Sequence, residues 1–408
     1  MADSSELKPS RLFALLSSSG MGHLTPFLRL AALLTAHHVK VTCRQSFILF
    51  HLRIFMPIQK MTLFTTTLKS PENHVTSSLS LLPSLSSPPL SAPVTDMTLT
   101  ASVLPISRAI NVPNYIFFTS SAKMLTLFVS FHTHTLVGSK DAIEMPTLEP
   151  IPKPWILPPL FQDMNNFLKT SFIENAKKMT ESDGILVNIS KTIEGKTLAE
   201  LNGGKVIEGL PLVIPIGLLP LYGFEKSQPL AWLDDQATGS VVDVSFGSRT
   251  GMSREQLREL GDDKKVDRED DLELSDVIGH ELMDSVKGKG LVVKHWLDQE
   301  SILRQSSNRR IFDLLWVEFI LAWPQHGDQK INADVVERTG MGIWVQSWGW
   351  GGEAIMKGEQ IAENISEMMG NELLRIQEMR IREEARTAIE QGGSLKKRLT
   401  ELVEMWKN

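Results

Sequence analysis

The sequence predicts an α/β fold with parallel β-sheets, arranged in two domains. Two segments, residues 11–36 and 240–260, have the same order of a short apolar run, a glycine-containing loop and a helical pattern. That order is typical of a βα unit, which places its functional loops at the carboxyl ends of parallel strands. The chain has 408 residues, enough for two or three domains and a well-buried core.

In the first βα unit, residues 11–17 predict a strand and residues 27–36 a helix, since apolar side chains recur there at helical spacing. Pro26 stands near the start of that helix, where proline is tolerated. A glycine-containing loop that ends at His23 joins the two elements. Further apolar runs and helical patterns predict strands at 37–42, 115–120 and 184–188, and helices at about 75–85 and 121–131.

The second domain is predicted to follow the proline-punctuated apolar stretch 210–220, which gives domains of 1–220 and 221–408. Its first strand, 240–248, leads into a glycine loop, and Ser253 is placed to cap a helix that continues to 260. Short apolar runs and a long amphipathic region predict strands at 290–296, 319–323 and 342–345, and helices across 357–407, the last of which packs back on the first domain.

The composition fits a globular protein and excludes several functional classes. Apolar residues make up 42% and charged residues 22%, and a net charge of −6 without a basic stripe gives no support to nucleic-acid binding. The single cysteine, Cys43, excludes an internal disulfide and suits a reducing compartment. No apolar stretch predicts a membrane span, and residues 1–10 lack the pattern of a secretory signal. We therefore expect a cytoplasmic enzyme.

His23 is the first candidate for chemistry. A side chain in a glycine-flanked loop after a strand faces a cleft, and the histidine pKa of about 6.5 suits proton transfer at neutral pH. A loop histidine that caps the following helix or meets solvent explains the same pattern. Asp96 could orient such a histidine by accepting its Nδ1 proton, although a strand-end or turn aspartate explains it as well.

Two other loops carry weaker signals. The loop at 245–248 offers backbone N–H groups at a helix start, where anions bind, but many α/β proteins have such a loop without a ligand. Asp328 and Gln329 put a carboxylate and an amide on one loop, a pair that suits sugar hydroxyls; a polar turn is the alternative. The histidines lack partners at zinc-ligand spacing, so no metal site is predicted.

The sequence contains three informative segments, GMGHLTPFLRLAALL (20–34), WLDDQATGSVVDVSFGSRTGMSREQLRELG (232–261) and LAWPQHGDQKINADVVE (321–337). Together they resemble the plant UDP-sugar-dependent glycosyltransferases, and the first and third resemble those members that C-glucosylate 2-hydroxyflavanones and dihydrochalcones. The resemblance implies a GT-B fold, with two Rossmann-like domains facing each other across a cleft. The first domain would bind a small phenolic acceptor and the second UDP-glucose, in a monomer that needs neither metal nor cofactor, because the UDP-sugar is a co-substrate.

The resemblance also implies a role for individual residues. His23 would be the general base of an inverting displacement, and Asp96 would hold its imidazole and stabilise the imidazolium. The contacts to the donor would come from Thr119 at the sugar, Gly247 and Ser248 near the diphosphate, Trp296 and Gln299 at uracil and ribose, and Asp328 and Gln329 at the glucosyl hydroxyls.

The chain departs from the family pattern inside the donor signature that starts at Trp296. Residues 303–318 replace the part that carries a phosphate-binding histidine, an Asn-Ser pair and a ribose-binding glutamate, and a second gap follows Gly261. The second domain is therefore predicted to be incomplete. Loss of three charge-assisted hydrogen bonds, at roughly 1.5–3 kcal/mol each, is as large as the binding free energy of a micromolar complex, about 8 kcal/mol. The affinity for the UDP-sugar is therefore predicted to nearly vanish unless other residues, such as Arg309 and Arg310, reach the diphosphate. Two functions remain open: a UDP-glucosyltransferase acting on a flavonoid-like phenol, with C-glucosylation included, or a non-catalytic homologue without the core of the donor site.

Overall fold

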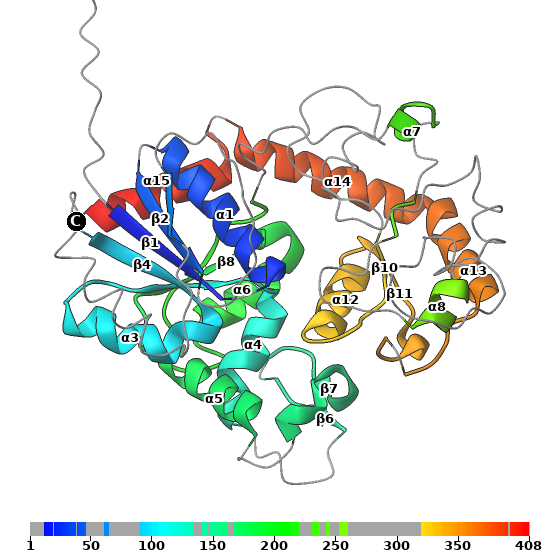
Figure 1. Cartoon of the computed structure of the whole chain (residues 1–408), viewed down its shortest axis with the longest axis horizontal. Coiled ribbons are helices and arrows are strands. Elements are labelled where there is room, and N and C mark those ends of the chain that lie inside the picture. Colours follow the sequence, from blue (N-terminus) through cyan, green and yellow to red (C-terminus); the bar gives the residue numbers. More distant parts are fainter. Residues whose placement is uncertain are drawn as a thin grey trace, which may run out of the picture. The chain divides into compact units, whose positions relative to one another are not determined.

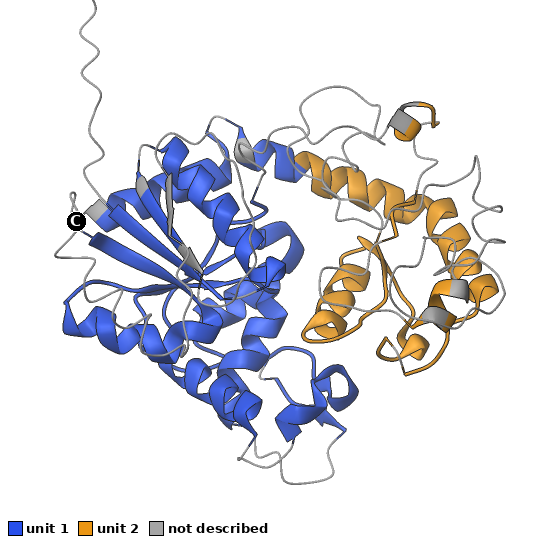
Figure 2. Cartoon of the chain, viewed as in Figure 1, with its two compact units in different colours: residues 1–223, 384–408 blue, residues 224–383 orange. Residues whose placement is uncertain are grey.

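The computed structural model divides the chain into two compact units, Met1–Gly223 with Glu384–Asn408 and Phe224–Glu383 (Figure 2). The predicted helix at 75–85 and the predicted strand at 290–296 lie outside the described residues. The structure describes residues 12–18, 20–37, 39–45, 61–64, 90–133, 141–145, 147–161, 166–219, 231–236, 242–244, 253–259, 320–351, 353–390 and 392–407.

Unit 1 is built on a seven-stranded sheet in the order β3-β2-β1-β4-β5-β8-β9. Every pairing in this sheet is parallel. The chain adds strands from β1 outward on one side and from β4 outward on the other, so the order reverses between β1 and β4. Ligands of open α/β sheets bind at the carboxyl side of such a switch point. The strands are β1 Leu12–Ser17, β2 Lys40–Gln45, β3 Met61–Phe64, β4 Leu90–Asp96, β5 Tyr115–Phe118, β8 Gly184–Val187 and β9 Val213–Pro215.

Helices cover both faces of this sheet, because alternate residues of β1 point to opposite sides. Phe13 and Leu15 pack in the main core with α1 and α15, whereas Leu16 packs against Val103 of α3. Figure 1 shows α1 and α15 on one side of the strands and α3 on the other. The helices of unit 1 are α1 Met21–Ala36, α3 Thr100–Ala109, α4 Ala122–Ser130, α5 Phe167–Met179, α6 Lys191–Asn202 and α15 Ser394–Lys407, with a small β6 (Ala142–Ile143) and β7 (Ile151–Pro152) ladder and short 3-10 turns at Met97–Leu99, Phe131–Thr133, Lys153–Trp155 and Pro158–Phe161.

The C-terminal helix α15 supplies a large part of the unit 1 core. Trp406 is buried, and its ring lies 4.8 Å from that of Phe13 and 5.1 Å from that of Tyr115, measured between ring centroids. Leu395, Leu399 and other apolar residues of the same helix belong to the same cluster. The last residues of the chain therefore complete the core around the first strand.

Replacing Trp406 with alanine is expected to lower the free energy of unfolding by about 3–5 kcal/mol, because the lost indole leaves a cavity against β1 and β5. Urea unfolding followed by circular dichroism measures this change. Met405→Ala is the matched control: the neighbouring side chain is 45% exposed, so its loss should change stability by about 0.5 kcal/mol or less. Equal losses in the two variants would contradict the packing argument.

Several sequence predictions for unit 1 are confirmed, and two are wrong in part. The strands predicted at 11–17, 115–120 and 184–188 are β1, β5 and β8, and the helix at 121–131 is α4, whose Ser121 accepts a hydrogen bond from the Met124 amide. The predicted strand at 37–42 is found slightly later, as β2. The stretch 210–220, predicted to separate the two domains, contains β9, which is an edge strand of the sheet, where proline is tolerated.

Unit 2 has a two-stranded parallel ladder of β10 and β11 among its described residues. The strands predicted at 319–323 and 342–345 are these two, and the Ser253 cap is confirmed by the bond from the Gln256 amide to its Oγ at 3.1 Å. Of the strand predicted at 240–248, the structure describes only 242–244 and assigns them no strand. The elements are α7 Ala231–Asp234, α8 Arg254–Glu259, β10 Ile320–Ala322, α12 Gln329–Arg338, β11 Gly342–Trp344, a 3-10 turn at Gln346–Trp348, α13 Gly358–Gly370 and α14 Glu372–Ile389, which continues across the unit boundary.

Candidate active site

Unit 1 brings His23, Asp96 and Thr119 together at the switch point of its sheet. His23 follows β1, Asp96 ends β4 and Thr119 comes directly after β5. These three strands are neighbours in the order β1-β4-β5 and run parallel, so their carboxyl ends meet at one edge. Residues that are far apart in the sequence thus share one small volume.

His23 lies in the first turn of α1 and not in a loop, which corrects the predicted start of this helix at residue 27. Gly20 has φ 106°, a value that glycine adopts readily, and it lets the chain turn directly into the helix at Met21. The backbone amides of His23 and Leu24 donate to the Gly20 carbonyl at 3.1 and 2.9 Å. Helical geometry therefore fixes the backbone that carries the imidazole.

A short hydrogen-bond chain orients the His23 ring. Its Nδ1 lies 2.8 Å from Oδ2 of Asp96 and 3.1 Å from Oγ1 of Thr119. The second oxygen of Asp96, Oδ1, accepts from the backbone N–H of Thr98 at 2.9 Å and from its hydroxyl at 2.6 Å. Asp96 is fully buried, whereas the His23 side chain is 25% exposed.

This arrangement determines which nitrogen of His23 can act as a base. A carboxylate oxygen only accepts hydrogen bonds, so the nitrogen that faces Asp96, Nδ1, carries the proton. The other nitrogen, Nε2, then presents its lone pair, which is the tautomer that a general base requires. A proton taken up at Nε2 creates an imidazolium, which the buried carboxylate stabilises.

Thr98 is a further residue of the candidate site, and the sequence analysis missed it. It follows Asp96 by two positions, and its amide and hydroxyl both bind the same carboxylate oxygen. A carboxylate that bonds to the backbone two residues later is a local pattern of Asp and Asn. The sequence Asp96-Met97-Thr98 has this spacing, so it could have indicated Thr98 as the partner of the carboxylate.

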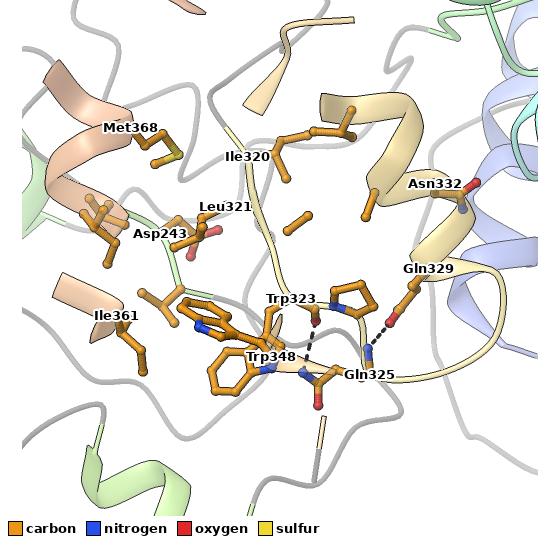
Figure 3. Close-up of a pocket in the computed structure, with 17 residues that line it drawn as sticks. Asp243, Ile320, Leu321, Trp323, Gln325, Gln329, Asn332, Trp348, Ile361 and Met368 are labelled. Atoms are coloured by element: carbon orange, nitrogen blue, oxygen red, sulfur yellow. Dashed lines mark hydrogen bonds between the residues drawn. The ribbon is translucent and has the colours of Figure 1, made fainter. Parts of the chain in front are cut away.

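In unit 2, Asp328 is the N-cap residue of α12 and Gln329 is the first residue of that helix, whereas the sequence analysis placed both on one loop. The side-chain amide oxygen of Gln329, Oε1, accepts hydrogen bonds from the backbone amides of Gln325 and His326 at 2.6 and 3.1 Å. Figure 3 shows Gln329 directed toward Gln325. Oδ2 of Asp328 accepts from the Asn332 side chain at 3.0 Å. Part of the polarity of this pair therefore shapes the loop itself.

A mostly apolar cavity of about 400 Å³ lies beside this loop, and Gln329 is the one residue of our predicted site among its described lining residues (Figure 3). Its volume is at the lower end of the range of small-molecule pockets. Trp323 and Trp348, whose ring centroids are 5.1 Å apart, form part of its wall. The lining residues are Val242, Asp243, Val244, Ile320, Leu321, Ala322, Trp323, Pro324, Gln325, Gln329, Asn332, Ala333, Val336, Trp348, Ile361, Ile365 and Met368.

The tryptophan-rich loop 346–353 supports the segment that carries Asp328 and Gln329. Gly351 donates its amide to the Pro324 carbonyl at 2.8 Å, and a side chain at Gly351 would collide with Gln325. Lys330 Nζ lies 4.3 Å from the centroid of the Trp350 ring, and burial lowers the pKa of this lysine. Trp344 and Trp348 are buried.

The remaining predicted donor residues are Gly247, Ser248, Trp296 and Gln299, and they lie outside the described residues. Within the described ranges, no group of three or more histidine, cysteine, aspartate or glutamate side chains could hold a metal ion. Among the described residues, the candidate residues therefore lie in two separate places: His23, Asp96, Thr98 and Thr119 in unit 1, and Asp328 with Gln329 in unit 2.

Comparison with known proteins identifies the family. A scan of protein-family models finds none that matches the chain. UDP-glycosyltransferase 708G2 of Citrus unshiu is 41% identical, over 100% of this chain and 99% of the relative. The chain belongs to the plant UDP-glycosyltransferases. UDP-glycosyltransferase 708D1 of Glycine max is 34% identical, with 97% of each chain covered, and UDP-glycosyltransferase CGT of Oryza sativa subsp. indica is 33% identical, with 96% of this chain and 95% of the relative covered.

Solved structures of the family give the same fold. The crystal structure of LpCGTa in complex with UDP has a TM-score of 0.80 at 34% identity and covers 98% of this chain and 99% of that one. Medicago truncatula UGT71G1 complexed with UDP-glucose has a TM-score of 0.78 at 19% identity over 98% and 99% of the two chains, which shows the fold alone. This glycosyltransferase therefore has the GT-B fold, and its family takes the sugar from a UDP-sugar co-substrate without a further cofactor.

Proposed function

We propose that this glycosyltransferase moves glucose from UDP-glucose to a flavonoid-like phenolic acceptor and that His23 is its general base. The observation that carries this proposal is the contact of His23 Nδ1 with the fully buried Asp96 at 2.8 Å, which leaves Nε2 as the proton acceptor. Thr98 holds the same carboxylate through two hydrogen bonds. Both oxygens of the buried carboxylate accept hydrogen bonds, and one of them faces the partly exposed imidazole. Such a carboxylate stabilises the protonated form of the imidazole, as a general base requires.

In the proposed reaction, Nε2 of His23 removes the proton from a phenol hydroxyl of the acceptor. The resulting nucleophile attacks the anomeric carbon of glucose from the face opposite the diphosphate. The new bond forms as the bond between that carbon and the diphosphate oxygen breaks, UDP leaves with the electron pair, and the configuration inverts. The removed proton stays on Nε2 until solvent takes it up.

The nucleophile of the proposed reaction is either the phenolate oxygen or the ring carbon next to it, which shares the negative charge. Attack through carbon gives a dienone, which then loses the proton of that ring carbon while the phenol oxygen regains one, so that the aromatic ring is restored. The resemblance of residues 20–34 and 321–337 to C-glucosylating members favours the carbon, and one relative from Oryza sativa carries the name CGT. A C-glucoside retains its sugar in hot acid, whereas an O-glucoside is hydrolysed. Acid treatment of the product therefore distinguishes the two outcomes.

The proposal assigns the acceptor to the domain 1–220 and the donor to the domain 221–408. In the donor domain, Asp328 and Gln329 would bind the glucosyl hydroxyls, with Thr119 contributing from the first domain. Trp296 and Gln299 would bind the nucleoside, and Gly247 and Ser248 would lie near the diphosphate. A monomer in the cytoplasm accords with the composition, and no helix among the described residues is long and apolar enough to cross a bilayer.

The second candidate function is that of a non-catalytic homologue with an incomplete donor site. One observation favours it: the alignment with the Citrus unshiu relative runs over 474 residues although this chain has 408, so part of the relative faces gaps. In the sequence analysis, residues 303–318 replace a longer part of the family signature and a gap follows Gly261, and both positions lie within the donor domain. Measurement of donor binding therefore separates the two functions.

Titration calorimetry with UDP is expected to give a dissociation constant in the micromolar range, about 8 kcal/mol of binding free energy. ADP is the control ligand, because it carries the same diphosphate on a different base and should bind at least tenfold more weakly. Incubation with UDP-glucose and a dihydrochalcone, followed by chromatography, then tests turnover. No heat at millimolar UDP, together with no product, would favour the non-catalytic homologue.

A further inference from the structure

Glu194 is a buried carboxylate that has no part in the chemistry described above. It is 6% exposed and stands on α6, where its backbone leaves helical geometry with φ −129° and ψ 38°. Its Oε2 accepts from the backbone amide of Ala122 at 2.7 Å, and its Oε1 accepts from that of Lys123 at 2.8 Å. A side chain on one helix thus binds the first turn of another helix through both of its oxygens.

The first turn of α4 is the part of that helix that needs such partners. The first amides of a helix have no acceptor within the helix, and the helix dipole favours a negative charge there. Ser121 accepts from the Met124 amide, and Glu194 accepts from the two amides between them. Burial raises the pKa of Glu194, while the two amides and the nearby Lys123 oppose that rise.

A very short connection leads from the end of β5 to this first turn, and it contacts His23 on the way. Only residues 119–121 lie between the end of β5 and the start of α4. Phe118 on one side of this connection and Ala122 on the other are fully buried, so both of its ends are fixed by packing. Thr119 is its first residue, and its Oγ1 lies 3.1 Å from Nδ1 of His23.

We propose that Glu194 is a positioning residue for His23, which acts through the first turn of α4 and Thr119. By holding the amides of Ala122 and Lys123, its carboxylate sets where α4 begins and hence where Thr119 meets the imidazole. Thr119 and Asp96 together then keep the Nδ1 side of the ring fixed and Nε2 directed outward. This inference rests on the proposed role of His23 as the general base.

Glu194→Gln is the test variant, because glutamine has the size of glutamate but turns an NH₂ group toward one of the two amides. We expect the first turn of α4 to shift and kcat to fall by about 10- to 100-fold, the cost of a small misplacement at a reacting group. Circular dichroism shows whether the variant is folded. Asn166→Ala is the matched control, since Asn166 caps α5 through the amides of Leu168 and Lys169 at 2.9 and 3.4 Å.

The deciding measurement is the pKa of the His23 ring, followed by NMR of histidine-labelled protein and assigned by comparison with His23→Gln. Loss of the Thr119 contact and a looser bond to Asp96 both destabilise the imidazolium, so the His23 pKa should fall by about 0.5 unit or more in Glu194→Gln. The Asn166→Ala protein should keep the pKa of the unaltered protein. This titration needs no turnover, so it tests the role of Glu194 even if the proposed activity fails.

Thr119→Val supplies a second test of the same connection. It should lower the His23 pKa by a similar amount, and the double variant with Glu194→Gln should show less than the sum of the two shifts, because both act on one contact. An unchanged His23 pKa in folded Glu194→Gln would overturn the proposal. So would equal shifts in Glu194→Gln and Asn166→Ala, because these would reflect general destabilisation, or additive shifts in the double variant.

Discussion

Replacing His23 with alanine is expected to lower kcat by about 10²–10⁴-fold, because the proposed reaction loses its general base. The side chain is partly exposed, and its Nδ1 contacts Asp96 and Thr119. Its removal should therefore leave the fold intact. Initial rates with UDP-glucose and a saturating dihydrochalcone measure the effect. Calorimetry should give the same affinity for UDP as in the unaltered protein, because no donor contact is proposed for His23.

The control for this variant is His37→Ala, which removes a histidine from the other end of the same helix. It should keep kcat within about twofold, since it lies beyond the last turn of α1 and takes no part in the proposed chemistry. Product formation at the unaltered rate in His23→Ala would remove His23 from the role of base. Equal losses in both variants would point to damage to α1 instead.

The strands that frame the site could be predicted where apolar runs were continuous. β1, β5 and β8 are such runs, as is typical of strands buried on both faces. β4 was not among the predicted strands; it contains Pro93, and proline is rare inside a central strand. Pro93 nevertheless lies between β1 and β5 in the sheet, and its pairing with β1 follows a shift of register at Leu12 and Phe13.

His23 could be chosen as a candidate from its neighbours in the sequence, but its contact with Asp96 could not be derived from them. Asp96 is 73 positions away, and it reaches the imidazole only because β4 lies next to β1 in the sheet. The sequence therefore left the role of Asp96 open, and the family resemblance favoured its pairing with His23. The same limit applies to Glu194, because its partners belong to a helix that lies 72 positions earlier in the chain.

In unit 2, the sequence predicted a carboxylate and an amide as candidate sugar ligands, but it did not predict that the amide of Gln329 binds its own loop. The pair Asp328 and Gln329 was chosen because a carboxylate and an amide suit sugar hydroxyls. In the structure, the Gln329 carbonyl binds two backbone amides of its own loop. An amide that holds a loop and an amide that binds a ligand have the same sequence pattern, so only the fold distinguishes them.

Asp96→Asn is expected to lower kcat by about 10³–10⁴-fold, because it changes the tautomer of His23 while it keeps the shape of the site. Asparagine has one acceptor and one donor where aspartate has two acceptors. The oxygen nearer Thr98 receives two hydrogen bonds, from the amide and the hydroxyl. The asparagine carbonyl will therefore take that position, and its NH₂ group will face His23.

An NH₂ group opposite Nδ1 requires Nδ1 to be the acceptor, which moves the ring proton to Nε2. The nitrogen that faces the acceptor substrate then has no lone pair for the proton. Exchange of the corresponding aspartate in a serine-protease triad, which keeps the geometry but gives the wrong tautomer, costs about 10⁴-fold in kcat. ¹⁵N chemical shifts of the His23 ring report directly which nitrogen is protonated, so the tautomer can be read without turnover.

Asp96→Ala separates the tautomer effect from the loss of charge. Alanine removes the carboxylate and leaves Nδ1 beside Thr119 alone, so the ring is free to place its proton on either nitrogen and part of the population keeps Nε2 as the acceptor. Asp96→Ala should therefore retain more activity than Asp96→Asn, once both are corrected for the folded fraction measured by circular dichroism. If Asp96→Asn keeps Nε2 unprotonated and loses less than about tenfold in kcat, the carboxylate does not set the state of the base. We expect the opposite result, because the amide and hydroxyl of Thr98 fix the position of the asparagine oxygen. The asparagine variant should then be less active than the alanine variant, and its His23 ring should carry the proton on Nε2.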